Sequence, residues 1–324
     1  MENNFESRIN LSGLTDKMNS VKKEISKHII GQDKMIDLLL LALLADGHVL
    51  IEGVPGVAKT ITAKLLSKTI HAEFKRIQFT PDLMPSDIIG TSIFNVKNSD
   101  FEFKKGPIFA NIVLTDEINR APAKTQAALF EAMEERQVSV DGHTYKLDEP
   151  FLVLATQNPI EQEGTYRLPE AQLDRFIFKI MVNYPEHEDE NTMLLNFHNN
   201  KGMIDVNQVT PILSKKELIA FRKTIAQIVA EGNLLKYITS IVQATRKNPS
   251  LFLGASPRAS IAILNAAKAS AAIQGRDFIT PDDIKFVCPP VLRHRIILTP
   301  EKEMEGITTD AVIQQIIDKV EVPR

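Results

Sequence analysis

The 324-residue sequence contains a single cysteine, Cys288. One cysteine excludes a disulfide framework and a metal cluster built on several thiolates. The longest apolar run, LLLLALLA at 38–45, is shorter than the about 20 residues that a transmembrane helix needs. The N-terminal segment MENNFESRIN is polar and does not resemble a signal peptide. Together these absences predict a cytoplasmic protein that does not enter a membrane.

The sequence also lacks an excess of positive charge. Its 38 Lys and Arg residues are balanced by 41 Asp and Glu residues, which leaves a net charge of -3. Without a broad basic surface, a nucleic-acid partner is not expected. Internal repeats and low-complexity tracts are missing as well. The length predicts two domains, and the 44% of hydrophobic residues are enough for sizeable cores.

Apolar strands alternate with helical segments in the first part of the chain. Strands are expected at 48–53, 74–79, 110–118, 151–159 and 176–185, and helices at 17–46, 59–71 and 122–136. This alternation predicts an α/β domain whose parallel sheet has helices on both faces. Two hairpins interrupt it at about 88–105 and 137–147, and the second contains a strong Asp141-Gly142 turn signal.

No strand is expected after residue 185. Helical spacing occurs at about 186–200, 215–232, 234–247, 257–274, 281–293 and 309–320. The stretch TPDD at 280–283 has the pattern of a capping box at a helix start. We therefore predict an α/β domain over residues 1–185 and an all-helical domain over residues 186–324.

The stretch GVPGVAKT at 53–60 nearly matches the phosphate-binding pattern G-x-x-x-x-G-K-[ST]. It follows an expected strand and precedes an expected helix, where main-chain N–H groups can bind phosphate. Lys59 would reach the β- and γ-phosphates, and the Thr60 hydroxyl would bind Mg²⁺. An ordinary turn before a helix is the alternative. The predicted nucleotide-binding residues here are Gly53, Val54, Pro55, Gly56, Val57, Ala58, Lys59, Thr60 and Ile61.

Ala58 stands where the pattern has its last glycine. Gly53 and Gly56 could supply the sharp turn and any positive φ. We predict a helix-like, negative φ for Ala58, because a left-handed alanine would cost about 1–2 kcal/mol.

Polar residues end two of the expected strands. Asp116 and Glu117 follow IVLT at the carboxyl end of a strand, where ligands of open α/β sheets bind. Asp116 would hold Mg²⁺, and Glu117 would act as the base that polarises an attacking water. Asn158 ends the next strand and could orient that water. The alternatives are a solvated acidic pair and a turn-forming asparagine before Pro159.

Two arginines stand at helix and strand boundaries. Arg175 precedes the last expected strand and could stabilise charge on a transferred phosphoryl group, although a surface pair of Asp174 with Arg175 is the alternative. Arg258 follows Ser256 and Pro257 in the first turn of an expected helix, where a positive charge is unfavourable. That local violation suggests a functional task such as phosphate binding.

With these motifs, the sequence resembles the MoxR family of AAA+ ATPases over residues 10–320. GVPGVAKT matches the family's G-x-P-G-x-[AG]-K-[ST], so the alanine is a family variant. LTDEINRAPAKTQAALFEAMEERQV matches the Walker B stretch, LATQNPIEQEGTY and LPEAQLDRF match sensor 1 and the arginine-finger segment, and GASPRAS matches sensor 2. IIGQ at 29–32 matches the segment beside the adenine, which implicates Ile30 and Gly31. Arg167 departs from the proline of many relatives.

The resemblance implies a five-stranded parallel P-loop sheet with a helical lid. It further implies ATP and Mg²⁺ as cofactors, with Thr60 and Asp116 at the metal and Lys59, Glu117, Asn158 and Arg175 as catalytic residues. Such proteins form rings, typically hexamers, and remodel a client protein, often with a partner that carries a von Willebrand factor A domain. Arg175, Arg167 or Arg120 could act on the neighbouring subunit.

Two other functions remain possible at this point. The chain could be a nucleotide-dependent switch or scaffold with little turnover, but Glu117, Asn158 and Arg175 favour hydrolysis. It could also be a DNA-acting AAA+ protein, which the net charge disfavours.

Overall fold

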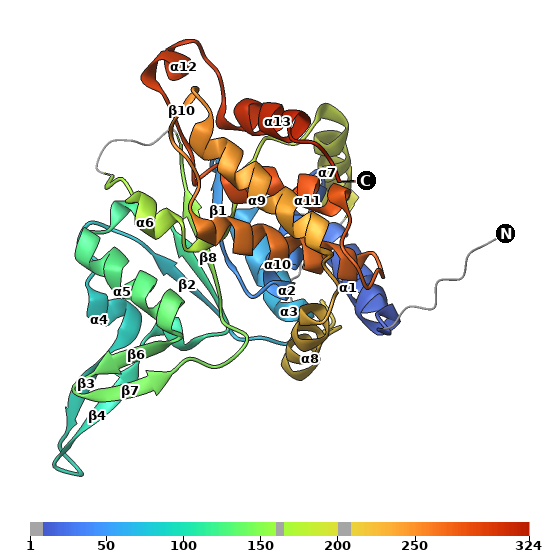
Figure 1. The fold of residues 1–324 in the computed structure, drawn as a ribbon. Helices are drawn as coiled ribbons and strands as arrows, with labels where there is room; N and C mark the ends of the chain where they lie inside the picture. Colours follow the sequence, from blue (N-terminus) through green and yellow to red (C-terminus); the bar gives the residue numbers. More distant parts are fainter. Residues whose placement is uncertain (1–8, 160–164, 200–208, 324) are drawn as a thin grey trace.

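The structure is a computed structural model that describes residues 9–159, 165–199 and 209–323. A five-stranded parallel sheet with the order β2-β5-β8-β1-β9 lies at its centre (Figure 1). Its strands are β1 (His48–Gly53), β2 (Phe74–Gln78), β5 (Ile112–Asp116), β8 (Leu152–Gln157) and β9 (Phe176–Val182). All five predicted strands and the predicted fold class are therefore confirmed.

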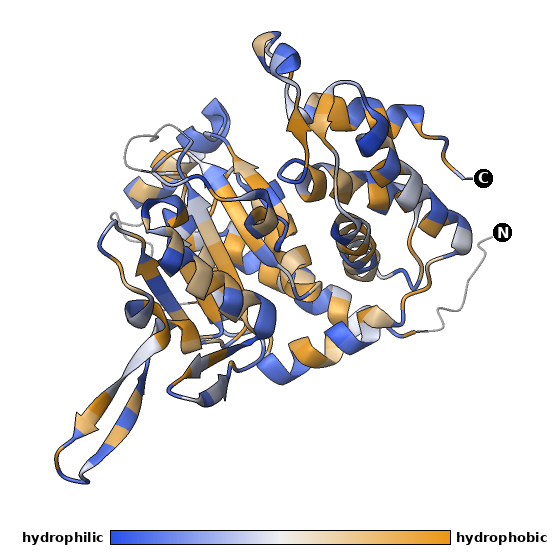
Figure 2. Ribbon diagram, turned by 60° about the vertical axis from the view of Figure 1, so that its left-hand side comes forward, coloured by the Kyte–Doolittle hydropathy of each residue, from blue (hydrophilic) through white to orange (hydrophobic). Residues whose placement is uncertain are grey.

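Helices cover both faces of this sheet. They are α1 (Ser12–Ser26), α2 (Asp33–Leu44) and α3 (Lys59–Thr69) on one face, and α4 (Pro85–Ile89) and α5 (Ala123–Glu135) on the other. The buried side chains of β1 alternate, since Val49 and Ile51 pack in the first core and Leu50 in the second. Figure 2 shows apolar residues along most strands of the central sheet. Burial on both faces explains the near-continuous apolar runs that predicted the strands.

The prediction of one helix over residues 17–46 is wrong, because the chain forms α1 and α2 with a break between them. Gly31 lies in this break with a φ of +73°. A Cβ at that position would approach Asp189 Oδ2 to 2.7 Å. A left-handed residue in such a close contact cannot continue a right-handed helix.

Two hairpins project from the sheet domain. They are β3 (Gly90–Asn95) with β4 (Asp100–Lys105), and β6 (Gln137–Val140) with β7 (His143–Lys146). Asp141 and Gly142 have φ values of 51° and 77°, as the predicted two-residue turn requires. Phe103 and Tyr145 stack with ring centroids 4.4 Å apart, so the two hairpins are joined. Single 3₁₀ turns, η1 (Pro107–Phe109) and η2 (Ile118–Arg120), flank β5.

The C-terminal part is mainly helical. It contains α7 (His187–Asn199), α8 (Lys215–Ala226), α9 (Gly232–Lys247), α10 (Pro257–Ile273), α11 (Pro281–Leu292), α12 (Pro300–Met304) and α13 (Thr309–Lys319). The Thr280 capping box with Asp283 is confirmed. A short antiparallel pair, β10 (Leu251–Leu253) with β11 (Ile297–Leu298), corrects the expectation of no strand after residue 185. Residue 200 of the expected helix at 186–200 and residues 160–164 of the sensor 1 segment lie outside the described residues.

Three consecutive side chains attach the helical part to the sheet. Arg293 Nη1 donates to the carbonyl of Lys179 (3.0 Å), and His294 Nε2 donates to that of Phe176 (2.9 Å). Arg295 Nη2 donates to the same Phe176 oxygen (2.7 Å). Because β9 is the last strand of the sheet, its outer carbonyls need such partners.

Candidate functional site

The glycine loop 53–60 joins the carboxyl end of β1 to the start of α3. A Cβ on Gly53 would lie 2.6 Å from the carbonyl oxygen of Val182, so only glycine fits against β9 there. Gly56 has a φ of +87° and open space beside it. Lys59 Nζ donates to the carbonyl of Gly53 at 2.5 Å, which closes the loop on itself. The loop therefore presents main-chain N–H groups at a helix start, the geometry that binds phosphate.

Ala58 does not have the helix-like φ predicted from the sequence. It has a φ of 60° and a ψ of 17°, in the left-handed region, as the N-cap residue of α3. The loop keeps the backbone shape of its glycine-containing pattern, and the alanine methyl raises the free energy of this conformation by about 1–2 kcal/mol. Backbone strain of this kind is typical of functional loops.

Thr156 of β8 positions both acids at the end of β5. Its hydroxyl donates to Asp116 Oδ1 (2.9 Å) and accepts the backbone N–H of Glu117 (3.0 Å). The Asp116 side chain is buried. The backbone of Glu117 lies in the left-handed region, with a φ of 56°. The threonine thus holds the carboxylate of one acid and the strained backbone of the other.

Side chains from β2 and η2 pair with the same two carboxylates. Arg76 Nε lies 2.6 Å from Asp116 Oδ2, and Gln78 Nε2 donates to Glu117 Oε2 at 2.8 Å. Arg120 Nε lies 3.1 Å from the same Glu117 oxygen. Arg76, Gln78 and Thr156 were not predicted from the sequence. The signal for the first two was their place at the end of a strand parallel to β5, where Gln78 is in register with Asp116.

Lys59 is electrostatically coupled to the acids. Burial lowers the pKa of its ammonium group, and the charges of Asp116, Glu117 and Glu52 act in the opposite direction. Thr60 follows it at the first turn of α3, so the Thr60 hydroxyl and the Asp116 carboxylate are the oxygen groups that could hold a metal ion once Arg76 releases Asp116. Oxygen ligands of this type are those that Mg²⁺ prefers, so the donor set fits this ion.

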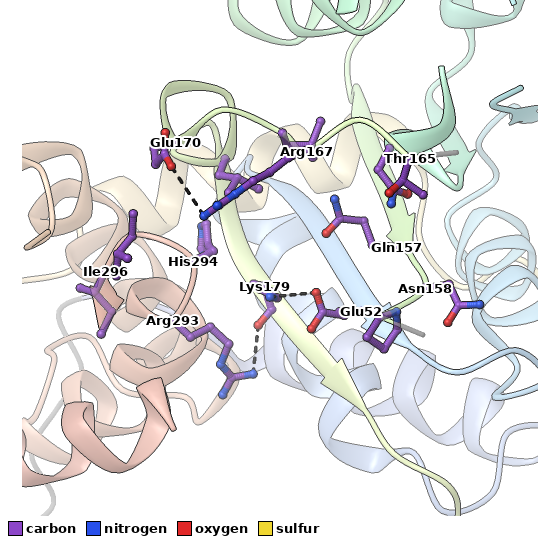
Figure 3. A pocket seen from close by; sticks show the side chains of 15 residues that line it. Glu52, Gln157, Asn158, Thr165, Arg167, Glu170, Lys179, Arg293, His294 and Ile296 are labelled. Carbon is purple, nitrogen blue, oxygen red and sulfur yellow. Dashed lines mark hydrogen bonds and ion pairs between the residues drawn. The ribbon is translucent and has the colours of Figure 1, made fainter. Parts of the chain in front are cut away.

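A cavity of about 630 Å³ lies between the carboxyl ends of the strands and the helical part. Figure 3 shows Asn158, Glu52 and Lys179 at its sheet side and Arg293 at its other side, with Glu52 paired to Lys179 at 2.9 Å. Arg167 also lines this cavity. The structure therefore places Asn158 and Arg167 at the same sheet edge as the glycine loop.

The segment with Ile30 and Gly31 lies against the chain that leaves β9. Gln32 Nε2 donates to the carbonyl of Asn183 at 3.0 Å, and Gly31 contacts Asp189 of α7. Because β9 neighbours β1, this segment is at the carboxyl edge of the sheet as well.

Arg175 and Arg258 lie at the other end of the central strands, where β1 begins, which we call the amino edge of the sheet. They share the carboxylate of Glu134, with Arg175 Nε at 3.7 Å and Arg258 Nη2 at 2.9 Å. Both line a small cavity with Asp46 and Gly47, which directly precede β1. The six residues of β1 separate that cavity from the glycine loop by about 20 Å. Neither arginine can therefore reach phosphate in the loop of its own chain.

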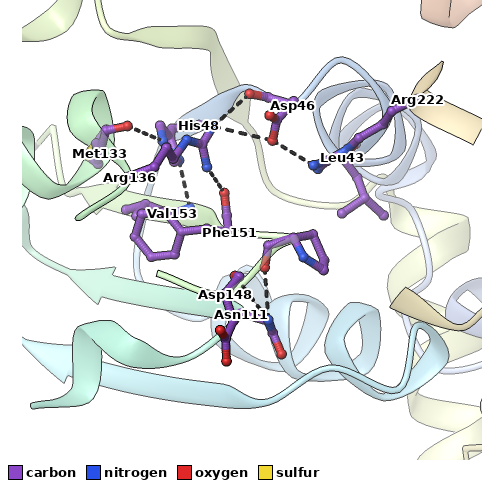
Figure 4. A network of polar contacts seen from close by, with 11 residues as sticks. Leu43, Asp46, His48, Asn111, Met133, Arg136, Asp148, Phe151, Val153 and Arg222 are labelled. Carbon is purple, nitrogen blue, oxygen red and sulfur yellow. Dashed lines mark hydrogen bonds and ion pairs between the residues drawn. The ribbon is translucent and has the colours of Figure 1, made fainter. Parts of the chain in front are cut away.

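A polar network anchors this amino edge (Figure 4). His48 Nδ1 accepts the N–H of Val153 (3.0 Å), and its Nε2 donates to the carbonyl of Met133 (3.2 Å). Burial is the main reason that the pKa of His48 falls to about 3. Arg222 Nη1 lies 2.7 Å from Asp46 Oδ1, so the turn before β1 is also tied to α8.

The five-stranded sheet, the glycine loop, the acids beside it and the helical C-terminal part together define a P-loop protein of the AAA+ class. Residues 48–178 match the model of the ATPase family associated with various cellular activities, and residues 243–316 match the AAA lid domain.

Similar proteins are known over nearly the whole chain. YeaC of Bacillus subtilis (strain 168) is 49% identical over 93% of this chain and 93% of its own. Chaperone MoxR1 of Mycobacterium tuberculosis is 44% identical over 93% of this chain and 81% of its own. A crystal structure of a protein from Cytophaga hutchinsonii superposes with a TM-score of 0.88 at 46% identity, covering 96% of both chains. The chain belongs to the MoxR family of AAA+ ATPases.

Within the part of the chain that the structure describes, no helix combines the length and the apolar character needed to cross a membrane.

Proposed function

We propose that this chain hydrolyses ATP with Mg²⁺ and works as a ring of identical copies. The observation that carries the proposal is that the charges of Asp116 and Glu117, two acids held together by Thr156, act on Lys59 of the glycine loop. Family membership supports nucleotide binding and ATPase activity in general.

Each residue of the site has a chemical task in this proposal. The loop N–H groups and Lys59 bind the phosphates, and Thr60 and Asp116 hold the metal ion. Glu117 polarises the attacking water, and Asn158 orients it. Bound Mg²⁺ would neutralise charge on the phosphates. For this, Arg76 and Gln78 must exchange their present partners, since both now bind the two acids.

The ring explains why Arg175 and Arg258 lie far from their own loop. In a head-to-tail ring, the amino edge of one copy can face the nucleotide of the next. Two guanidinium groups would then stabilise charge on the transferred phosphoryl group. Arg120 pairs with the Glu117 of its own chain and Arg167 lines the cavity at the same edge, so Arg175 is the best candidate to act on the neighbour.

The biological role that we propose is remodelling of a client protein in the cytoplasm. The name of the relative Chaperone MoxR1 supports a chaperone-like activity. Hexamers and a partner with a von Willebrand factor A domain are the assembly that we expect for this role.

The variant Glu117→Gln tests hydrolysis directly. It removes the base while leaving the loop intact, so phosphate release should fall about 100-fold or more while ATP still binds. Glu131→Gln, on the exposed side of α5, is the matched control and should keep the wild-type rate. Equal phosphate release from the wild type and Glu117→Gln would favour a nucleotide-dependent switch whose activity does not use this base.

A further inference from the structure

Asp174 directly precedes Arg175, and its carboxylate joins two other parts of the molecule. Arg295 Nε donates to Oδ1 at 2.7 Å, and the Ser256 hydroxyl donates to Oδ2 at 2.8 Å. One carboxylate thus connects the end of α6 (Glu170–Leu173), the segment after α11 and the start of α10.

Arg295 has no remaining donor and almost no exposed surface. Besides Asp174 Oδ1, its guanidinium binds the carbonyls of Asp174 (3.0 Å), Phe176 (2.7 Å), Ile177 (3.2 Å) and Val291. These bonds use all five N–H groups of an arginine. Its side chain is 3% exposed. A guanidinium bonded in this way has one position, and so does the carboxylate that it binds.

Ser256 carries the constraint on to the second arginine. It is the N-cap residue of α10, and its hydroxyl oxygen accepts the N–H of Arg258 at 3.2 Å. Asp174 is therefore adjacent to Arg175 in sequence and one hydroxyl away from the backbone of Arg258. The side chains of Arg175 and Arg258 both pair with the carboxylate of Glu134.

We propose that Asp174 and Arg295 are positioning residues that fix the spacing of Arg175 and Arg258, so that both reach one nucleotide on the neighbouring copy. This inference rests on the proposed function. A shift of about 1 Å in a group that stabilises a transition state can cost about 100-fold in rate. Preorganised cations are effective because they need no rearrangement during the reaction.

The variant Asp174→Asn keeps the shape of the side chain and removes its charge. It should lower the ATPase kcat about 100-fold, because the backbones of both arginines lose their common anchor. Nucleotide affinity and ring size should stay at wild-type values, since the glycine loop lies at the other edge. Ser256→Ala removes the bond to Oδ2 and the N-cap bond to the Arg258 N–H but keeps the Arg295–Asp174 bond, so it is the milder variant and should lower kcat about tenfold.

Asp310→Asn is the matched control. The Arg293–Asp310 ion pair, at 2.9 Å, also joins elements of the helical part. This ion pair does not involve Asp174, Arg175 or Arg258. This variant should keep kcat within about twofold of wild type. Arg175→Ala removes one of the two cations entirely, and its kcat is the reference value for that loss.

Mixed rings separate positioning of a neighbour from a merely structural role. Glu117→Gln protomers cannot hydrolyse but offer intact arginines, whereas Asp174→Asn protomers have an intact loop and acids. When the two variants are mixed in equal amounts, about a quarter of the head-to-tail interfaces join the loop and acids of an Asp174→Asn protomer to the arginines of a Glu117→Gln protomer. The mixture should therefore recover about a quarter of the wild-type rate. Each protein alone should be nearly inactive.

Three results would overturn this proposal. They are a wild-type kcat for Asp174→Asn, a mixture no more active than its separate components, and a loss of rate in Asp310→Asn as large as in Asp174→Asn. Failure of the proposed function looks different, because Glu117→Gln or Arg175→Ala would then hydrolyse ATP at the wild-type rate.

Discussion

The two edges of the central sheet hold their polar groups in different ways. At the carboxyl edge, Asp116 and Glu117 pair with side chains, one of which, Arg76, is 52% exposed. At the amino edge, His48 and Arg295 are buried; His48 binds main-chain groups, and Arg295 binds main-chain carbonyls together with the Asp174 carboxylate. The difference fits the chemistry. In the mechanism that we propose, the acids exchange partners when nucleotide and metal bind, whereas the groups that support the arginines keep their positions.

The largest test of this comparison removes a cation from the amino edge. Arg175→Ala should lower kcat by on the order of 1,000-fold, because an arginine that acts on the transferred phosphoryl group contributes about that much. ATP affinity should not change, since Arg175 lies far from its own loop. Steady-state kinetics and equilibrium binding of a fluorescent ATP analogue measure the two quantities separately.

Arg167→Ala is the control for Arg175→Ala. Arg167 lines the cavity at the carboxyl edge and is 84% exposed at its side chain. Its removal should change kcat only a few-fold. A large loss with Arg167→Ala and a small one with Arg175→Ala would reverse the assignment of the two edges.

Acid should destabilise the amino edge through its buried histidine. The pKa of His48 is about 3 in the folded chain and near 6.5 in the unfolded chain. Between these values only the unfolded state binds the proton, so stability should fall as pH drops below 6.5. The expected loss is up to about 1.4 kcal/mol per pH unit, measured by urea unfolding between pH 8 and pH 5.

His48→Gln should reduce this pH dependence, and His143→Gln, on an exposed strand, should leave it unchanged. An unaltered slope in His48→Gln would show that the histidine is not neutral and buried in the folded state. His294 should contribute in the same direction, since burial holds its pKa well below the usual value.

The smallest expected effect concerns the strained loop at the carboxyl edge. Ala58→Gly removes about 1–2 kcal/mol of left-handed strain but adds about 0.5–1 kcal/mol of unfolded-state entropy, so stability should rise by up to about 1.5 kcal/mol. Ala220→Gly, on the exposed face of α8, should instead lower stability by about 1 kcal/mol. Urea unfolding compares the two, and equal destabilisation of both would contradict the strain at Ala58.

The elements that the sequence predicted well have strong local patterns. The strands of a parallel sheet are apolar on both faces, and the Asp141-Gly142 turn requires particular residue types. The glycine loop and the acids after β5 were predictable because their motif fixes spacing along the chain.

Features that depend on contacts between distant segments could not be read in this way. Gly31 lies in the break between α1 and α2 and against Asp189, which comes 158 positions later in the chain. Asp174 and Arg295 are 121 positions apart, so neither suggested the other. The φ of Ala58 was predicted wrongly because local steric preference favours a negative value, whereas the phosphate loop imposes a left-handed one.

The most direct test of the whole account is a titration of the purified chain with Mg²⁺ and a fluorescent ATP analogue, for the wild type and Lys59→Ala. The account predicts one nucleotide per chain for the wild type and an affinity at least about 100-fold weaker for Lys59→Ala, because the lysine contacts the phosphates. Absence of binding to the wild type, or equal binding to both proteins, would contradict it.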